Sequence, residues 1–310
     1  MELYTLLGGN GTIGRELAPV LQHHQIPFRL VSRNPASIYG GETFAADLLN
    51  REKVFEAVKG SSVVFLLAGM RYRYKVWKKD WPLVMRHTID ACKAAGAKLV
   101  FFDNVYMYGK VDGLMTEETP LHPSSRKGQV RAEIARMLMD EINSGGLKAM
   151  IARSADFYGP GTKVNSVTGQ LVFERMKKKN KAQCLCDGGL PHSYTYTPDA
   201  ARALFHLAGR DSAYGQVWHL PTATPAPTAK EFVEKVSRYM QAPPGVQVLP
   251  TWMIRLIGLF VPEMGEFGEM LYQYQYPYHF DSSKFEKAFD FRPTSYEEGI
   301  KSTAAWFMKN

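Results

Sequence analysis

Short apolar runs alternate with longer stretches of helical period along the first half of the chain. The apolar runs resemble buried strands, and they cover residues 3–7, 28–31, 63–67, 99–102 and 149–152. The stretches of helical period between or beside them cover residues 13–23, 51–58, 81–95 and 130–143. Strands without polar alternation are typical of a sheet that helices bury on both faces. The alternation therefore predicts an α/β fold of Rossmann type with a doubly wound parallel sheet.

The alternation becomes less regular from about residue 155, where proline, glycine and aromatic residues are more frequent. Two helices remain well marked there, one over Pro198–Ala208 and one that Thr228 and Glu231 begin with a capping-box pattern. We predict a nucleotide-binding Rossmann domain over residues 1–155, to which elements from about 190–220 return, and a mainly substrate-binding lobe over 156–310. Ligands of such sheets bind beyond the carboxyl ends of the strands. Residues 68–74, 103–110 and 156–161 should therefore line one cleft.

Three glycines follow the first apolar run in the segment LYTLLGGNGTIGR, residues 3–15. Gly8 permits a tight turn, Gly11 lets the backbone approach a phosphate, and Gly14 lets the next helix pack closely on the strand. The N–H groups at the start of that helix attract an anion. The motif alone is weak evidence, but a strand precedes it, a helix follows it, and a second strand lies at the expected βαβ spacing. We therefore predict a site for a nucleotide pyrophosphate.

Length and composition are those of a globular protein, with 310 residues of which 45% are hydrophobic. The first strand begins at Leu3, which leaves no room for a signal peptide, and no apolar run approaches the ~20 residues that span a bilayer. We therefore expect a cytoplasmic protein. Cys92, Cys184 and Cys186 are odd in number and lack the partners of a zinc pattern, so we expect reduced thiols and no metal site.

The formal net charge is +8, and one run, Arg175 to Lys181, concentrates positive charge. The run has no interleaved aromatic residues of the kind that stack on bases, and cations are favoured near helix C-termini. We interpret it as a solvated helix end, with no nucleic-acid and no membrane partner. A phosphorylated cofactor accounts for part of the positive charge.

Five motifs, in order and spacing, resemble one family. They are GGNGTIG at 8–14, LLAG at 66–69, NVYMYG at 104–109, DFYGPG at 156–161 and YTYTPDAARAL at 194–204. The chain resembles an extended, atypical short-chain dehydrogenase/reductase of the NAD-dependent epimerase/dehydratase family. The resemblance covers nearly the whole chain. It implies a dinucleotide cofactor held by residues of the first two motifs, namely Gly8, Asn10, Gly11, Thr12, Ile13, Gly14, Leu67, Ala68 and Gly69.

The end of the second strand lacks the acidic residue that grips the ribose of NAD, and Ser32, Arg33 and Asn34 stand there instead. Arginine supplies a planar donor fork suited to a 2′-phosphate. We therefore expect NADP(H) to be preferred over NAD(H), the alternative being that Arg33 is a surface turn residue. Asp47 and Leu48 resemble the family's adenine-contacting pair, although Asp47 also fits a helix N-cap.

The family's catalytic Tyr and Lys, four residues apart on a helix, are missing where they belong. Glu133 resembles the acidic residue of the family's catalytic helix, and counting back from it places Ser125 and Gln129 at the Tyr and Lys positions. A shift of two residues places Lys127 and Arg131 there instead. The spacing does occur as Tyr74/Lys78 and Tyr106/Lys110, which we interpret as coincidences, because the first pair is expected in the loop after the fourth strand and the second at the turn after the fifth.

The replacement proton donor is predicted among Tyr106, Lys127 and Tyr72. Asn104 replaces the Ser or Thr that binds the substrate carbonyl, and an amide can donate that bond. Asp156 replaces the family's usual Asn and would orient the nicotinamide amide, act as a base, or cap a loop.

Substrate contacts are predicted at Tyr108 and Tyr158, which the family retains, and at His192. His192 stands where sugar-nucleotide members carry an Arg that binds the diphosphate, which argues against a UDP-sugar substrate; a structural role for it is also open. Tyr residues also recur at every second position over 272–278. They would wall a pocket, pack the lobe, cover a dimer surface, or form an edge strand.

Two functions fit these residues. The first is an NAD(P)-dependent oxidoreductase or epimerase-like enzyme with an atypical active site, acting on a small carbonyl or hydroxyl compound and possible as a homodimer. The second is a non-catalytic NADP(H)-binding sensor or partner-binding protein, because loss of the Tyr/Lys pair is what loss of chemistry looks like.

Overall fold

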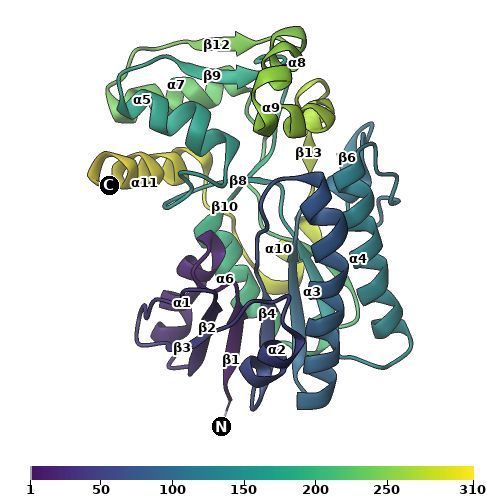
Figure 1. The fold of residues 1–310 in the computed structure, drawn as a ribbon. Helices are drawn as coiled ribbons and strands as arrows, with labels where there is room; N and C mark the ends of the chain where they lie inside the picture. The colour runs from purple at the N-terminus through teal and green to yellow at the C-terminus, as the bar shows by residue number, and fades with distance from the viewer. Residues whose placement is uncertain (1) are drawn as a thin grey trace. The chain divides into compact units, whose positions relative to one another are not determined.

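The computed structural model describes residues 2–310 and divides into two compact units (Figure 1). Unit 1 comprises residues up to 107, 127–154 and 200–218, and unit 2 comprises 108–126, 155–199 and 219–310. The chain therefore passes between the units several times. That unit 1 holds the cofactor and unit 2 the substrate stays a prediction.

Unit 1 is built on a seven-stranded parallel sheet, in the order β11-β7-β5-β4-β1-β2-β3. Its strands are β1 (Tyr4–Leu7), β2 (Phe28–Ser32), β3 (Glu42–Ala45), β4 (Val63–Leu66), β5 (Lys98–Asp103), β7 (Ala149–Arg153) and β11 (Val217–His219). Its helices are α1 (Thr12–His23), α2 (Arg51–Val58), α3 (Tyr74–Ala95), α4 (Arg126–Asn143) and α6 (Thr197–Ala208). The doubly wound Rossmann-type fold predicted from the sequence is confirmed.

The strands are apolar because both faces of the sheet are covered. Leu7, Val64 and Phe101 share one buried cluster with residues of α2, α3 and α4. Successive side chains of a strand point to opposite faces, so the equally buried Leu6, Phe65 and Val100 face the other side. The ring of His24, just after α1, stacks on Phe205 of α6 at 4.2 Å. Strand residues on both faces are therefore in the core.

Helix α3 begins seven residues before the predicted start at Trp81. Its buried face includes Trp77, Trp81, Val84 and Met85, an i, i+4, i+7, i+8 pattern that Pro82 does not interrupt because it lies on another face. Tyr74 and Lys78 therefore stand four apart on the helix, and their predicted place in a loop is wrong.

Unit 2 contains three short two-stranded parallel sheets, β10-β8, β12-β9 and β13-β6. Their strands are β6 (Leu114–Met115), β8 (Asp156–Tyr158), β9 (Ala182–Leu185), β10 (Tyr194–Tyr196), β12 (Val246–Leu249) and β13 (His279–Phe280). Its helices are α5 (Glu174–Lys177), α7 (Ala229–Met240), α8 (Thr251–Phe260), α9 (Pro262–Phe267), α10 (Ser283–Phe289) and α11 (Tyr296–Lys309). The predicted capping box of α7 is confirmed, because Thr228 and Glu231 exchange both hydrogen bonds.

Residues 272–278 do not form the edge strand that their alternating tyrosines suggested. A 3₁₀ helix covers Gly268–Tyr274, and a turn follows before β13. The alternation instead lets Tyr274 and Tyr278 pack on the two faces of one ring, that of His192. Within residues 2–310 no helix is long and apolar enough to cross a membrane. Cys92, Cys184 and Cys186 are free cysteines, and Cys92 and Cys184 are buried.

Candidate functional site

The turn between β1 and α1 tolerates no side chain at two of its glycines. Gly8 has φ +93°, and a Cβ there would lie 2.7 Å from the backbone of Ala68. A Cβ on Gly14 would lie 2.3 Å from the Gly9 carbonyl oxygen. A Cβ on Gly11 would lie 3.1 Å from the Gly8 carbonyl oxygen, a tight contact, but no other atom would lie within 4 Å of it, and Gly11 lines a cavity. Gly8 and Gly14 are thus required by packing, and Gly11 leaves room for a ligand.

A cavity of about 360 Å³ opens beside this turn within unit 1. Most of the predicted cofactor residues line it, namely Gly8, Asn10, Gly11, Ser32, Arg33, Asp47, Leu48, Ala68 and Gly69. Thr12, Ile13, Gly14, Asn34 and Leu67 are not in its lining. The N-cap of α1 is Gly11, which offers no side-chain cap, and the first turn carries no acidic residue. The positive end of the helix dipole is therefore not neutralised by α1 itself.

The rim of the cavity is polar and ordered by local bonds. Ser32 Oγ donates to Asn10 Oδ1 at 3.2 Å, while Arg33 is exposed. Asp47 Oδ1 accepts from the N–H of Leu49 at 3.0 Å. The N-cap of α2 is Asn50, whose side chain accepts from the Lys53 N–H, so the N-cap interpretation of Asp47 is wrong.

Three of the predicted catalytic residues, Tyr72, Tyr106 and Lys127, lie in unit 1 around the rings of Tyr72 and Trp77. The fully buried Lys127, on the first turn of α4, holds its Nζ 4.7 Å from the centre of the Tyr72 ring. The rings of Tyr72 and Tyr106 both pack on Trp77, one edge-on at 5.5 Å and the other stacked at 6.1 Å. Asn104 Oδ1 accepts from the N–H of Tyr106 at 3.1 Å, which leaves its NH₂ as the donor end.

A buried ion cluster adjoins these residues and was missed from the sequence. Asp103, the last residue of β5, accepts from Arg131 Nε at 2.8 Å and from Arg131 Nη2, and its second oxygen lies 3.8 Å from Arg153 Nε. The Arg131 guanidinium also covers the Trp81 ring at 4.4 Å. From the sequence, Arg131 stands out only as the residue at the Lys position when the alignment of the missing Tyr/Lys pair is shifted by two residues. Lys127 and Arg131 lie on the buried face of α4, whereas Gln129 is exposed.

Asp156 and His192 lie together in unit 2. His192 Nε2 is 3.1 Å from Asp156 Oδ2, and the Tyr274 hydroxyl donates to the same oxygen at 2.6 Å. The His192 ring is stacked between Tyr278 at 4.2 Å and Tyr274 at 4.9 Å. Tyr274 is thus a neighbour that only its period-two spacing hinted at.

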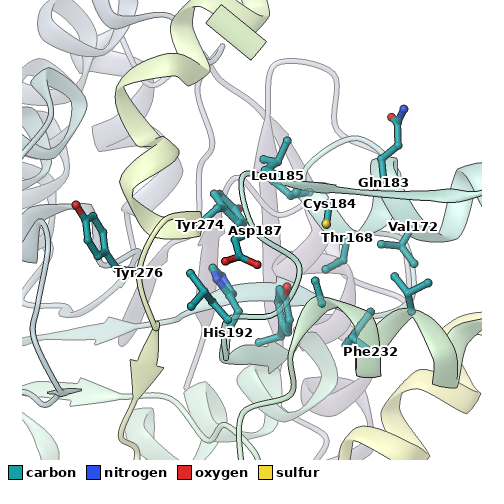
Figure 2. A pocket seen from close by; sticks show the side chains of 15 residues that line it. Thr168, Val172, Gln183, Cys184, Leu185, Asp187, His192, Phe232, Tyr274 and Tyr276 are labelled. Carbon is teal, nitrogen blue, oxygen red and sulfur yellow. The ribbon is translucent and has the colours of Figure 1, made fainter. Parts of the chain in front are cut away.

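The His192 ring borders a small cavity of about 30 Å³, room for roughly two waters. Figure 2 shows Asp187, Tyr274 and His192 around this space, with Cys184 and Thr168 on the far side. Asp187 is held in place because its Oδ1 accepts from the Gly189 N–H at 2.8 Å. The surroundings are therefore aromatic and acidic.

The remaining two predicted substrate residues are packed inside unit 2. The Tyr108 hydroxyl lies 2.7 Å from His219 Nε2, and the Tyr108 ring is 1% exposed. Tyr158 is also 1% exposed and stacks on Tyr296, and burial raises the pKa of its hydroxyl well above the usual range. Both side chains are part of the core of unit 2 in this structure.

Comparison with known proteins identifies the family. A family model described as the NAD dependent epimerase/dehydratase family matches residues 4–219, more than half of the chain. The chain belongs to the NAD dependent epimerase/dehydratase family. A curated member from Bacillus subtilis, described as an uncharacterized UDP-glucose epimerase, YtcB, is 22% identical over 223 residues, which cover 68% of this chain and 70% of that protein.

Solved structures of epimerases share the fold along the whole chain. The UDP-glucose 4-epimerase of Thermus thermophilus, in complex with NAD, is 21% identical with a TM-score of 0.78 and covers 99% of each chain. The UDP-glucose 4-epimerase of Thermotoga maritima, with UDP-glucose, is 19% identical with a TM-score of 0.81, covering 100% of this chain and 99% of that one. At this identity the likeness shows the fold.

Three residues of α3 in the cavity lining lie outside the motifs and outside the segments predicted to line the cleft. Val76, Asp80 and Val84 line the 360 Å³ cavity together with the glycine turn, as does Arg71, which falls within the predicted segment 68–74. Val76, Asp80 and Val84 recur at i, i+4 and i+8 along the start of α3. A helix predicted from Tyr74 would have placed these three residues on one helix face, and that face lines the cavity beside the glycine turn.

Proposed function

We propose that the chain is an NAD(P)-dependent enzyme that transfers hydride between the nicotinamide and a small carbonyl or hydroxyl compound. One observation supports it most: unit 1 combines a cavity beside the glycine turn with a buried lysine against a tyrosine ring. The first feature suits a dinucleotide and the second suits proton transfer to an oxygen. Family membership supports the same class of reaction.

The described residues fit the cofactor. A Cβ at Gly8 would enter the Ala68 backbone, so the turn is closed there, while the face beside Gly11 is open to a pyrophosphate. We propose that Gly11 and the start of α1 hold the pyrophosphate, and that Asp47 with Leu48 lies against the adenine. When bound, the nicotinamide supplies or accepts the hydride.

We propose NADP(H) as the preferred form, because Arg33 lies on the cavity lining and is exposed enough to reach a 2′-phosphate. Ser32 is already bonded to Asn10, which fixes the turn from which Arg33 projects. The Thermus thermophilus epimerase is complexed with NAD, so this preference would separate the chain from that relative.

The proton step is assigned to Tyr72, with Lys127 as its positioning charge and Asn104 as the donor to the substrate oxygen. Negative charge develops on the phenolic oxygen when it gives up its proton, and a fixed cation at the ring favours that charge in a site from which water is excluded. Tyr106, stacked on Trp77, is the second candidate.

The substrate is proposed to lack a diphosphate. Asp156 and Asp187 place two carboxylates around His192, and like charge disfavours a diphosphate at that position. UDP-glucose, which the Thermotoga maritima structure contains, is therefore the discriminating compound to test.

The experiment has two stages. Calorimetry with NADPH and NADH measures cofactor binding, and Gly11→Val should abolish it while the circular dichroism spectrum stays native, because the added side chain meets only the Gly8 carbonyl oxygen and open space. The second stage follows NADPH absorbance with aldehydes, ketones and imines, and follows product formation from UDP-sugars with NAD⁺ or NADP⁺ by chromatography, because an epimerisation returns its hydride and leaves no net change in cofactor absorbance. Turnover of UDP-glucose alone would overturn the substrate proposal. Tight NADPH binding with no turnover of any compound would overturn the enzyme and leave a sensor.

A further inference from the structure

The 360 Å³ cavity of unit 1 contains a carboxylate that has no role in the proposed function. Asp80 lies near the start of α3 and lines this cavity. Its helix neighbours at i−4, i−3, i+3 and i+4 are all apolar, namely Val76, Trp77, Leu83 and Val84. The helix itself therefore offers this carboxylate no cation.

The Asp80 carboxylate also has no partner from other segments. Over residues 2–310, no ion pair joins it to Arg33 or Arg71, the two cations of the cavity lining, and neither of its oxygens accepts a hydrogen bond. The residue is half-buried. A carboxylate that is partly removed from water gains from any donor that reaches it. Since Asp80 borders a cavity, a ligand in that cavity can supply the donor.

The cavity wall around Asp80 is mostly apolar and comes from two segments. Val84 lies on α3, and Leu48 and Leu49 lie on the segment that leads into α2. His87 Nδ1, also on α3, donates to the Leu48 carbonyl oxygen at 3.1 Å, and α2 packs beside α3 (Figure 1). The two apolar walls are therefore held together. Such walls suit the faces of a nucleobase ring.

Charge decides which part of a dinucleotide lies beside Asp80. The pyrophosphate is proposed at Gly11, where α1 offers the positive end of its dipole. Two carboxylates of the lining, Asp47 and Asp80, disfavour phosphate groups near them. The adenine base, which is uncharged, therefore fits beside these two residues better than the pyrophosphate does.

Hydrogen-bond chemistry then allows one kind of contact. The exocyclic amine is the donor group of adenine, and its ring nitrogens N3 and N7 accept. An ionised carboxylate has no proton to donate. A hydrogen bond between the base and Asp80 therefore runs from the 6-amino group to the carboxylate.

We propose that Asp80 selects the adenine base of the cofactor by accepting a hydrogen bond from its 6-amino group. The inference rests on the proposed function, because it takes this cavity as the dinucleotide site. Asp47 Oδ1 already accepts from the Leu49 N–H at 3.0 Å, whereas both Asp80 oxygens are available within residues 2–310. A base with a carbonyl oxygen in place of the amine would face Asp80 acceptor to acceptor and is rejected.

Calorimetric titration with NADPH and with its hypoxanthine analogue, in which a carbonyl oxygen replaces the 6-amino group, tests the assignment. The wild type should bind NADPH at least about tenfold more tightly than the analogue. Asp80→Asn should bring this ratio close to one, because its amide can donate to the carbonyl oxygen and its bond to the amine is no longer charge-assisted. The same titrations with NADH and its hypoxanthine analogue make the result independent of the 2′-phosphate.

Two further variants separate base selection from a general loss of binding. Asp80→Leu removes the acceptor without adding a donor, so it should weaken NADPH binding more than binding of the analogue. Asp90→Asn is the matched control, because Asp90 lies on the same helix, pairs with Arg51 at 3.7 Å and is outside the cavity lining. It should keep the wild-type ratio. Circular dichroism of each variant without cofactor verifies that the chain is folded.

The titrations distinguish failure of this inference from failure of the proposed function. If the wild type binds neither NADPH nor NADH, the dinucleotide site is refuted, and the role of Asp80 with it. Tight NADPH binding with equal affinity for the analogue would refute the role of Asp80 alone. A preference for NADPH that Asp80→Asn and Asp80→Leu leave unchanged would do the same, and the proposed function would stand.

Discussion

Units 1 and 2 each enclose a carboxylate within an aromatic cluster, but they surround it with opposite charge balance. In unit 1, Asp103 accepts hydrogen bonds from Arg131 and lies near Arg153. Lys127 of the same unit packs against the Tyr72 ring. In unit 2, Asp156 meets an imidazole and a phenol, and Asp187 lines the adjoining cavity. Cations outnumber the carboxylate in the described part of the first cluster, and carboxylates dominate the second.

The difference shows how one chain can favour an anion at one place and reject it at another. The unit 1 cluster supports negative charge that develops on an oxygen, whereas the unit 2 cluster disfavours a bound diphosphate. Aromatic rings are common to both clusters, because they exclude water and so strengthen the electrostatic interactions around them. The proposed function depends on this contrast, and four experiments test it.

The largest expected effect is on stability. Asp103→Asn leaves Arg131 and Arg153 buried beside a neutral group, and we expect it to lower the free energy of unfolding by about 3–5 kcal/mol. Asp156→Asn should cost only about 1 kcal/mol, because the amide oxygen still accepts from Tyr274. Denaturant titration of both variants measures the contrast. Equal losses would show that the two carboxylates are held in the same way.

The next effect is on turnover with a substrate found by screening. Tyr72→Phe removes the proposed proton donor and should lower kcat about 100-fold, with NADPH affinity little changed. Lys127→Met keeps the volume of the side chain and should lower kcat too, while Tyr239→Phe, on α7 of unit 2, where the hydroxyl donates to Glu297, serves as the control. If Tyr72→Phe keeps its rate and Tyr106→Phe loses it, the donor is Tyr106.

A smaller effect is expected at the cavity rim. Arg33→Ala removes one charge-assisted contact to a 2′-phosphate, which should cost about 1.5–3 kcal/mol of NADPH binding and leave NADH binding unchanged. Calorimetric titration with both cofactors checks it, with Arg51→Ala as a control, because Arg51 lies on α2 and is not in the cavity lining. Equal wild-type affinity for the two cofactors would contradict the NADP(H) preference.

The smallest expected effect is on the pH dependence of stability, through one carboxyl group of unit 1 whose pKa is set by burial. Burial raises the pKa of Glu16, on α1, from 4.5 to about 7. Between these values the unfolded chain loses the proton while the folded chain keeps it, so stability falls as the pH rises toward 7 and stays lower above it. Glu16→Gln should therefore raise the free energy of unfolding at pH 8 by on the order of 1 kcal/mol, which a higher melting temperature would show. At pH 4 the substitution should leave the melting temperature unchanged. No difference between the two pH values would mean that Glu16 is solvated.

Local features of the sequence carried much of the prediction. The turn from β1 to α1 follows from about a dozen consecutive residues, and its glycines are required by contacts within that turn and with Ala68. The bounds of α2 and the capping box of α7 follow in the same way from neighbours along the chain. Such features are readable because their hydrogen bonds and apolar periodicity lie within one element.

The sequence by itself determined the βαβ order, the glycine turn and the family, because the first two rest on residues close together in the chain and the family rests on short motifs in a fixed order. Tertiary structure decided that α3 begins at Tyr74, that Asp103 joins Arg131 and Arg153, and that tyrosines at 274 and 278 sandwich His192. The ion cluster and the His192 sandwich join segments far apart in sequence, and the first turns of α3 are held by the burial of Trp77 in the core, so packing overrides local preference. Burial of charge is a property of the folded chain, so the full burial of Lys127 could not be seen in the sequence alone.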